Sequence, residues 1–461
     1  MFSSVVIDAN LIARYGGNGP RYTSYPTADR FVEAFDAEAY RHWLHNRHVG
    51  SQTRPLSLYV HLPFCDTVCY YCACNKIVTR HHDRAAVYLA TLAKEVALVS
   101  RELGADRKVD QIHLGGGTPT FFSDREIREL MEILSKGFDL NPAGEYAIEV
   151  DPRGVGEERI AHLAELGFNR ISIGVQDFDP EVQRAVNRIQ TVEQTFAVTD
   201  AARRHNFRSV NYDLIYGLPR QTLEGFERTL DLVCKALPDR VALYSYAHLP
   251  TAFMPQRRIA LEDLPPPRIK LALMTCAIKM LGAAGYVYIG MDHFARPEDD
   301  LALAQNQGRL TRNFQGYSSG GDTDTIGLGV SAIGSIGPAT IQNHKDLSEY
   351  SASVDAGCLP VMRGIEASAD DLARRSVIQS LACHFRVSKE SVSIAHLMDF
   401  DRYFSLEIQE LALLKEDGLV EMDDEWITVT PAGRLLVRAV CMVFDRHLRE
   451  GRQRARYSRV M

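Results

Sequence analysis

Residues 56–74 read LSLYVHLPFCDTVCYYCAC and combine a short β-rich run with four cysteines. After the run at 56–61 come Cys65, Cys69 and Cys72, spaced Cys-x3-Cys-x2-Cys, and then Cys74. Thiolates bind soft or borderline metals, so the loop predicts either a zinc site or an iron–sulfur site. Zinc sites usually pair cysteines in two separated knuckles, whereas this run is one contiguous loop. Three close thiolates suit one face of a cubane cluster and leave one iron without a protein ligand.

The chain beyond this loop has a repeating βα pattern. Further β-rich runs lie at 111–114, 146–150, 170–175, 209–216 and 241–246. Segments with helical periodicity separate most of them, at 85–103, 124–136, 157–166, 192–204 and 223–236. Each segment is long enough to return the chain for a parallel neighbour. We therefore predict an α/β fold, a partial (βα)6 TIM-like barrel.

Functional groups in such barrels lie at the C-terminal ends of the strands. The informative residues of this chain fall there: Cys65, 115–118, Glu149, Gln176, Asp213 and Ala247. This coincidence predicts one shared active-site face.

Three regions are expected along the chain. Residues 1–50 form an irregular N-terminal arm that ends in a short helix near 34–45. The barrel domain, 51–365, includes a glycine-rich, irregular stretch at 305–345, which we assign to the site because long loops in compact chains are usually functional. Residues 366–461 form a mainly helical, winged-helix-like domain with a hairpin at 418–429 and a final helix at 431–447.

Composition narrows the class of protein. The chain has 461 residues, of which 46% are hydrophobic and 24% charged, as in a folded enzyme. Its net charge of −7 argues against a whole-molecule nucleic-acid binder. We see no signal peptide and no run of about 18 apolar residues, so we expect a cytoplasmic protein without a membrane span. Four crowded cysteines in a reducing compartment indicate a metal or redox site and not a disulfide framework.

Several motifs together carry a family resemblance. They are PRYTSYPTA (20–28), YVHLPFC (59–65), CACNKI (72–77), GGGTP (115–119), EVDPR (149–153), GVQDF (174–178), DLIYGLP (213–219), GMDHFARP (290–297) and the closing SRV (458–460). The cysteine spacing, with Tyr71 before the third cysteine, resembles the radical SAM superfamily. The full set is similar, nearly end to end, to the bacterial oxygen-independent coproporphyrinogen III oxidases. Ala73 departs from the glycine expected between the last two cysteines, which affects local loop geometry only.

The resemblance implies an activity in porphyrin and haem biosynthesis. These iron–sulfur oxidoreductases convert two propionates of coproporphyrinogen III to vinyl groups by oxidative decarboxylation, giving protoporphyrinogen IX. The implied mechanism uses a 5′-deoxyadenosyl radical, a [4Fe-4S] cluster and two molecules of S-adenosylmethionine. The implied cluster ligands are Cys65, Cys69 and Cys72. Cys74 is predicted not to be a ligand, because a fourth thiolate would close the cluster to S-adenosylmethionine.

The resemblance also implies cofactor contacts. For the first S-adenosylmethionine they are Tyr59, Gly116, Glu149 and Ile333. For the second they are Tyr71, Gly117, Thr118, Gln176, Arg188, Asp213 and Ala247. Simpler interpretations of these residues exist: the glycines could form a turn, Glu149 could be a solvated acid, and Arg188 and Asp213 could form a structural ion pair. We interpret His113, His248 and His293 as structural.

Substrate carboxylates need cationic partners, and the sequence does not choose among Arg153, Lys76, Arg312 and the terminal arginines. The implied partners are coproporphyrinogen III and a reducing donor such as flavodoxin or ferredoxin, and we expect a monomer. One alternative is a haem-binding chaperone of the same family, although CNKI (74–77) and the 20–28 segment favour the oxidase. A zinc-dependent regulator with a winged helix is another.

Overall fold

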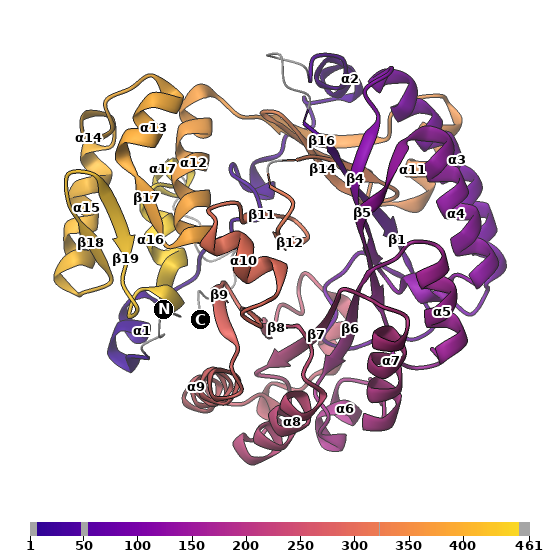
Figure 1. The fold of residues 1–461 in the computed structure, drawn as a ribbon, viewed down its shortest axis with the longest axis horizontal. Helices are drawn as coiled ribbons and strands as arrows, with labels where there is room; N and C mark the ends of the chain where they lie inside the picture. Colours follow the sequence, from indigo (N-terminus) through magenta and orange to yellow (C-terminus); the bar gives the residue numbers. More distant parts are fainter. Residues whose placement is uncertain (1–6, 48–53, 322, 451–461) are drawn as a thin grey trace.

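A computed structural model describes residues 7–47, 54–321 and 323–450 of the chain. Within these residues the centre is a twelve-stranded sheet in the order β16-β15-β14-β13-β1-β4-β5-β6-β7-β8-β10-β9 (Figure 1). Its parallel strands are β13 (Asp324–Leu328), β1 (Leu56–Leu62), β4 (Lys108–Gly116), β5 (Asp139–Val150), β6 (Arg170–Gln176), β7 (Ser209–Tyr216) and β8 (Arg240–Ser245). The antiparallel edge strands are β14 (Ile333–Ile336), β15 (Ala339–Asn343) and β16 (Val361–Glu366) at one end, and β10 (His293–Ala295) and β9 (Val287–Gly290) at the other.

Helices cover the outer face of the parallel strands and make the sheet a partial barrel. They are α3 (Asp83–Leu103), α4 (Asp124–Gly137), α5 (Glu157–Glu165), α6 (Pro180–Ala185), α7 (Val192–Arg204), α8 (Leu223–Ala236), α9 (Pro267–Ala283) and α11 (Leu347–Asp355). Strand β1 is buried at every position except the half-buried Tyr59, as expected for a strand covered on both faces. The predicted (βα)6 pattern is confirmed.

The C-terminal part has a hydrophobic core of its own and lies across from the barrel in Figure 1. Its helices are α12 (Ala369–His384), α13 (Lys389–His396), α14 (Phe400–Tyr403), α15 (Ser405–Glu416), α16 (Val437–Val443) and α17 (Arg446–Glu450). A small antiparallel sheet joins β17 (Arg386–Ser388), β19 (Trp426–Val429) and β18 (Val420–Met422). Helix α10 (Asp300–Asn306) packs in this core too.

The N-terminal arm connects the two parts. It contains α1 (Ala9–Tyr15), a 3-10 turn (Ala28–Arg30) and α2 (Ala37–His45). Arg438 of α16 donates to Pro20 O at 3.0 Å, and further along the arm Val32 forms a β-bridge with Gly364 of β16. The 20–28 motif therefore runs from the C-terminal part to the edge of the barrel sheet.

Two local predictions differ from the structure. The stretch 305–345 is not irregular: it contains β11 (Thr311–Asn313), β12 (Gly316–Ser318) and strands β13 to β15. These strands have only three to five residues, which leaves little local signal, and β13 is paired with the distant strand β1. The helix predicted at 431–447 is broken into a 3-10 turn (Arg434–Leu436), α16 and α17. The closing SRV motif and four of the six terminal arginines lie outside the described residues.

No helix in the described part of the chain is long and apolar enough to cross a membrane.

Candidate active site

The cysteine loop begins where β1 ends. Cys65 lies in a two-residue strand that pairs with residues 77–78, which closes the loop on itself. Cys65 and Cys69 are buried and Cys72 is half-buried. Asn187 holds the loop from outside by donating to Val68 O at 2.7 Å. The three predicted ligands therefore lie on one anchored loop at the C-terminal end of the first barrel strand.

Donors from two other barrel segments reach the sulfur atoms of this loop. The Thr118 hydroxyl donates to Cys65 Sγ at 3.4 Å, and Arg188 Nη1 donates to Cys69 Sγ at 3.7 Å. Burial raises the pKa of Cys65 to about 11, against the effect of the Thr118 hydrogen bond. Arg188 itself is buried and pairs with Asp151 at 3.0 Å. Hydrogen bonds and positive charge of this kind favour thiolates, which are the form that binds iron.

The loop does not have the geometry of a single-ion site. Among the described residues, no three Cys, His, Asp or Glu side chains converge closely enough to hold one metal ion. A zinc site would require such convergence, whereas a four-iron cluster spreads its ligands over several metal atoms. Three thiolates on one loop are a donor set that fits a four-iron cluster, in which each would bind a different iron.

Cys74 lies at the exposed end of the same loop. Its thiol forms a hydrogen bond with Cys72, which, with the charge of Lys76, lowers the pKa of Cys72 to about 6 although burial acts in the opposite direction. Lys76 Nζ donates to the carbonyl oxygen of Cys72 at 3.3 Å. These contacts therefore favour the thiolate form of Cys72.

The glycines at 115–117 let two strand ends approach closely. A Cβ atom on Gly117 would lie 2.7 Å from the carbonyl oxygen of Phe64 and the carbonyl carbon of Pro63. Gly116 has a φ of +113°, and a Cβ there would meet the ring of His61 at 2.7 Å. The glycines therefore hold β4 against the segment that leads into Cys65, which is more than the simple turn that their sequence allows.

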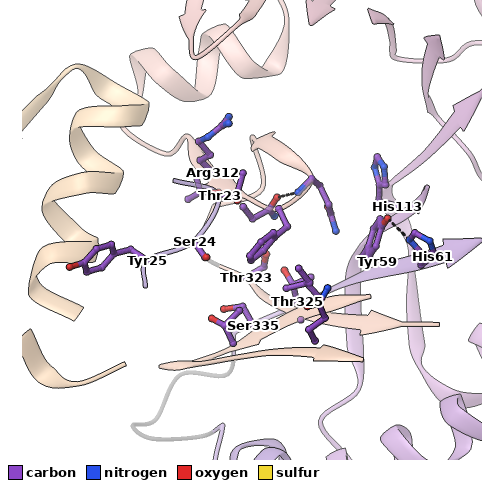
Figure 2. Close-up of a pocket in the computed structure, with 18 of the residues that line it drawn as sticks. Thr23, Ser24, Tyr25, Tyr59, His61, His113, Arg312, Thr323, Thr325 and Ser335 are labelled. Atoms are coloured by element: carbon purple, nitrogen blue, oxygen red, sulfur yellow. Dashed lines mark hydrogen bonds between the residues drawn. The ribbon is translucent and has the colours of Figure 1, made fainter. Parts of the chain in front are cut away.

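One wall beside these glycines carries Glu149 and a group of rings. Figure 2 shows the rings, which are those of Tyr59, His61 and His113. Glu149 Oε1 is 3.2 Å from His113 Nε2, and Glu149 Oε2 accepts from the backbone N–H of Gly116 at 3.3 Å. The Tyr59 ring stacks on His113 at 5.9 Å, and its hydroxyl is 3.1 Å from His61 Nδ1. Glu149 is thus partly exposed but held in place, and not the freely solvated acid of the simpler interpretation.

A second group lies on β6 and β7, with Gln176 at the end of β6 and Asp213 within β7. Gln176 has a left-handed backbone with φ of 63°. Asp213 accepts from the Ser172 hydroxyl at 2.8 Å and from Asn211 Nδ2 at 2.9 Å. Burial raises the pKa of Asp213 to about 6. Because Arg188 pairs with Asp151, the alternative of an Arg188–Asp213 ion pair is not formed.

The remaining three predicted residues lie on other elements than the two groups above. Tyr71 is half-buried on the cysteine loop, and its carbonyl oxygen accepts from Gln256 at 3.0 Å. Ala247 follows β8 and is half-buried. Ile333 begins β14, on the other side of β1.

A cavity of about 1950 Å³ opens between the barrel face and the C-terminal part. Five predicted residues line it: Tyr59, Cys72, Gly116, Glu149 and Ile333. A smaller cavity of about 150 Å³ inside the barrel is lined by Asp213 and shares Glu149 and His113 with the larger one. Asp213 of the second predicted group thus lies beside residues of the first group, whereas the other six described residues of the second group line neither cavity.

The wall of the large cavity is basic, although the chain is acidic. Seven cationic side chains line it: Arg47, Arg54, Lys76, Arg309, Arg312, Lys345 and Arg375. Only two acids among the described residues do so, Glu149 and Asp324. The charge of the lining is therefore opposite in sign to the net charge of −7 of the whole chain.

The structure distinguishes among the cations that the sequence offers as partners of the substrate carboxylates. Lys76 and Arg312 line the large cavity. Arg312 is 6% exposed, and one of its buried guanidinium nitrogens, Nη1, has no acceptor among the described residues. Arg153 instead binds Asp151 at 2.6 Å. Most of the terminal arginines lie outside the described residues.

Sequence reasoning missed His61 and Asp151. His61 lies between Tyr59 and the cysteine loop, where its Nε2 donates to Asn75 O at 2.9 Å and burial lowers its pKa. Asp151 lies two residues after Glu149 in the same motif. His61 lies near the end of β1 and Asp151 directly follows β5. This position at the C-terminal end of a barrel strand could have identified both as site residues.

Comparison with known proteins places these features in context. Residues 59–233 match the model of the Radical SAM superfamily. The chain is 50% identical to the oxygen-independent coproporphyrinogen III oxidase of Pseudomonas aeruginosa over 100% of both chains. It is 48% identical to the protein of that name from Escherichia coli K12, over 98% of each. The solved structure of the coproporphyrinogen III oxidase HemN from Escherichia coli, described as a radical SAM enzyme, covers 97% of this chain and 100% of its own, with a TM-score of 0.91 and 46% identity.

Proposed function

This chain belongs to the family of oxygen-independent coproporphyrinogen III oxidases, and we infer from that membership that it is a radical SAM oxidoreductase of haem biosynthesis. It converts two propionate side chains of coproporphyrinogen III to vinyl groups by oxidative decarboxylation, without oxygen, and the product is protoporphyrinogen IX.

The basic cavity beside the cysteine loop is the observation that best supports this function in the structure. Coproporphyrinogen III carries four propionate carboxylates, and in the described part of the chain seven cationic side chains and two acidic ones line the cavity. Charge complementarity of this kind orients an anionic ligand and speeds its encounter. The cavity volume of about 1950 Å³ exceeds that of sites for drug-sized ligands, about 300–1,000 Å³.

The family implies an iron–sulfur cluster and S-adenosylmethionine as cofactors. We propose that Cys65, Cys69 and Cys72 hold a [4Fe-4S] cluster, since they share one anchored loop with sulfur-directed donors. When bound, the cluster and S-adenosylmethionine supply the one-electron chemistry of the reaction. The chain itself holds the ligands, orients the propionates against the cysteine loop and limits access of water. The electrons for the cluster come from a reducing donor such as flavodoxin or ferredoxin.

We further propose that two S-adenosylmethionine molecules bind. Tyr59, Gly116, Glu149 and Ile333 serve the first, which is supported by their common position on the wall of the large cavity. The second is served by Tyr71, Gly117, Thr118, Gln176, Arg188, Asp213 and Ala247. Arg188 suits a carboxylate and Asp213 suits an amine or hydroxyls.

Anaerobic turnover tests the function. The reconstituted protein, incubated with S-adenosylmethionine, a reductant and coproporphyrinogen III, should form 5′-deoxyadenosine and protoporphyrinogen IX. The chaperone alternative predicts instead tight haem binding in a titration and no vinyl-forming turnover. A brown anaerobic preparation would exclude the zinc regulator, because zinc is spectroscopically silent.

Replacing Cys74 with serine should leave the cluster in place. Cys74 lies at the exposed end of the loop, beyond the three proposed ligands. Iron and sulfide analysis of anaerobically reconstituted Cys74→Ser should therefore give the wild-type content per chain. Loss of the whole cluster would show that Cys74 is a ligand.

Replacing Asp213 with asparagine should change the pH dependence of S-adenosylmethionine binding. With a pKa raised to about 6, wild-type Asp213 is ionised above pH 6 and protonated below it. Affinity for the second molecule should therefore fall as the pH drops from 8 to 5, and the fall should be smaller in Asp213→Asn. Equilibrium binding at each pH gives the dissociation constant of each protein for the second molecule. The titration of the ligand itself affects both constants equally, so it cancels in their ratio. Parallel profiles would contradict the role of Asp213.

A further inference from the structure

A buried polar network supports the end of β6, and no part of the proposed mechanism uses it. Its central residue is Asp177, which is 1% exposed and immediately follows Gln176. The carboxylate accepts from the Thr229 hydroxyl at 2.5 Å, from Gln221 Nε2 at 2.6 Å and from the backbone N–H of Asp179 at 2.8 Å. A buried carboxylate is costly unless it is paired in this way, so the network calls for an explanation.

The backbone that Asp177 anchors is kinked. The pairing of β6 with β7 shifts register between Gly174 and Gln176, and Gln176 takes a left-handed φ of 63°. Irregularities of this kind redirect side chains and occur beside active sites. A glutamine in the left-handed region is strained, and such strain persists only where the surroundings over-determine it.

Buried amides complete the support. Gln190 Nε2 donates to Val175 O at 2.7 Å, and Gln183 Nε2 donates to Asp177 O at 3.0 Å. The two glutamines are linked, because Gln190 N donates to Gln183 Oε1 at 3.1 Å. Gln183 belongs to α6, and Gln190 lies two residues after Arg188. The network therefore ties the segment that carries Arg188 to the kink in β6.

The network holds the side chains of Gln176 and Arg188 close to the same glycine, Gly174. A Cβ atom on Gly174 would lie 2.8 Å from both Gln176 Nε2 and Arg188 Nη2, so the two groups come together over this glycine. Arg188 Nη2 also donates to Gly174 O at 2.7 Å, while its Nη1 reaches Cys69 Sγ. Both residues belong to the group proposed for the second S-adenosylmethionine.

We propose that Asp177 is a positioning residue for the second S-adenosylmethionine, holding the kink of β6 so that Gln176 and Arg188 stay together beside Cys69. This rests on the proposed function. Asp177 does not touch the ligand: it acts through the backbone of Gln176 and through the segment of Arg188.

Asp177→Asn is the direct test. The asparagine amide would face donors on every side, so at least one of the three hydrogen bonds is lost and the kink relaxes. We expect the second equivalent of S-adenosylmethionine to bind about tenfold more weakly, in line with the loss of a charge-assisted hydrogen bond. The first equivalent, and the iron and sulfide content, should be unchanged. Equilibrium dialysis with labelled S-adenosylmethionine measures both equivalents.

Matched variants separate positioning from general damage. Asp299→Asn removes another buried carboxylate, which binds Arg240 at 2.8 Å in a different network, and should leave both equivalents unchanged. Thr229→Val removes one donor to Asp177 and should weaken the second equivalent by a smaller factor, while Thr229→Ser restores it. This pair decides the question if Asp177→Asn does not fold.

The binding experiments test the role of Asp177 separately from the proposed enzymatic function. If Asp177→Asn, or Thr229→Val in its place, binds two equivalents with wild-type affinity, the proposal is overturned. A wild-type protein that binds a single equivalent also overturns it, even if protoporphyrinogen IX forms. Absence of that product from the wild type would count against the function, independently of the binding results.

Discussion

Cys69→Ala should contain no cluster and make no protoporphyrinogen IX. Cys69 is buried between its partner cysteines, and its sulfur accepts a hydrogen bond from Arg188. Alanine removes the thiolate and leaves the buried guanidinium without this acceptor, and no other cysteine of the loop replaces it at the same position. Iron and sulfide analysis and the anaerobic assay measure the effect.

Cys358→Ala is the matched control for this loss. Cys358 is exposed and lies outside the cysteine loop. Its variant should keep wild-type iron content and turnover. Equal iron content in Cys69→Ala and Cys358→Ala would mean that the loop is not the cluster site.

Gly117→Ala should destabilise the protein and disturb the cluster loop together. The added Cβ would lie 2.7 Å from backbone atoms of Pro63 and Phe64, and backbone cannot move aside as a flexible side chain can. Overpacking of this kind costs about 1–3 kcal/mol. The forced shift acts on the segment just before Cys65, so iron content should fall as well. Urea unfolding and iron analysis test the two effects.

Gly282→Ala provides the opposite expectation for the same chemical change. Gly282 lies in α9, and its added Cβ would meet nothing within 4 Å. Alanine in a helix should therefore stabilise the fold by roughly 0.5–1 kcal/mol without altering iron content. A Gly117→Ala protein as stable as the wild type and fully loaded with iron would contradict the close packing described here.

The barrel could be predicted from the sequence because its elements have strong local patterns. The strand at Ser209–Tyr216 and the helices at Val192–Arg204 and Leu223–Ala236 agree with prediction at both ends. Capping boxes at Ser123 and Thr191, each formed by residues three apart in the sequence, mark the starts of α4 and α7. Such signals depend on neighbours in sequence, so they survive without tertiary information.

The features that escaped prediction depend on distant partners. The strands after residue 310 are short, and one of them, β13, joins β1 across more than 250 residues of chain. The basic cavity collects Arg47, Lys76, Arg312 and Arg375 from the arm, the cysteine loop, β11 and α12. Likewise, the partner of Arg188 is set by which strand ends face each other, and that is Asp151.

Mössbauer spectroscopy of the 57Fe-reconstituted wild type tests the central claim most directly. With Cys65, Cys69 and Cys72 as the protein ligands, one iron of four should differ from the rest and change its signal when S-adenosylmethionine is added. Four equivalent irons that do not respond to S-adenosylmethionine would contradict the account.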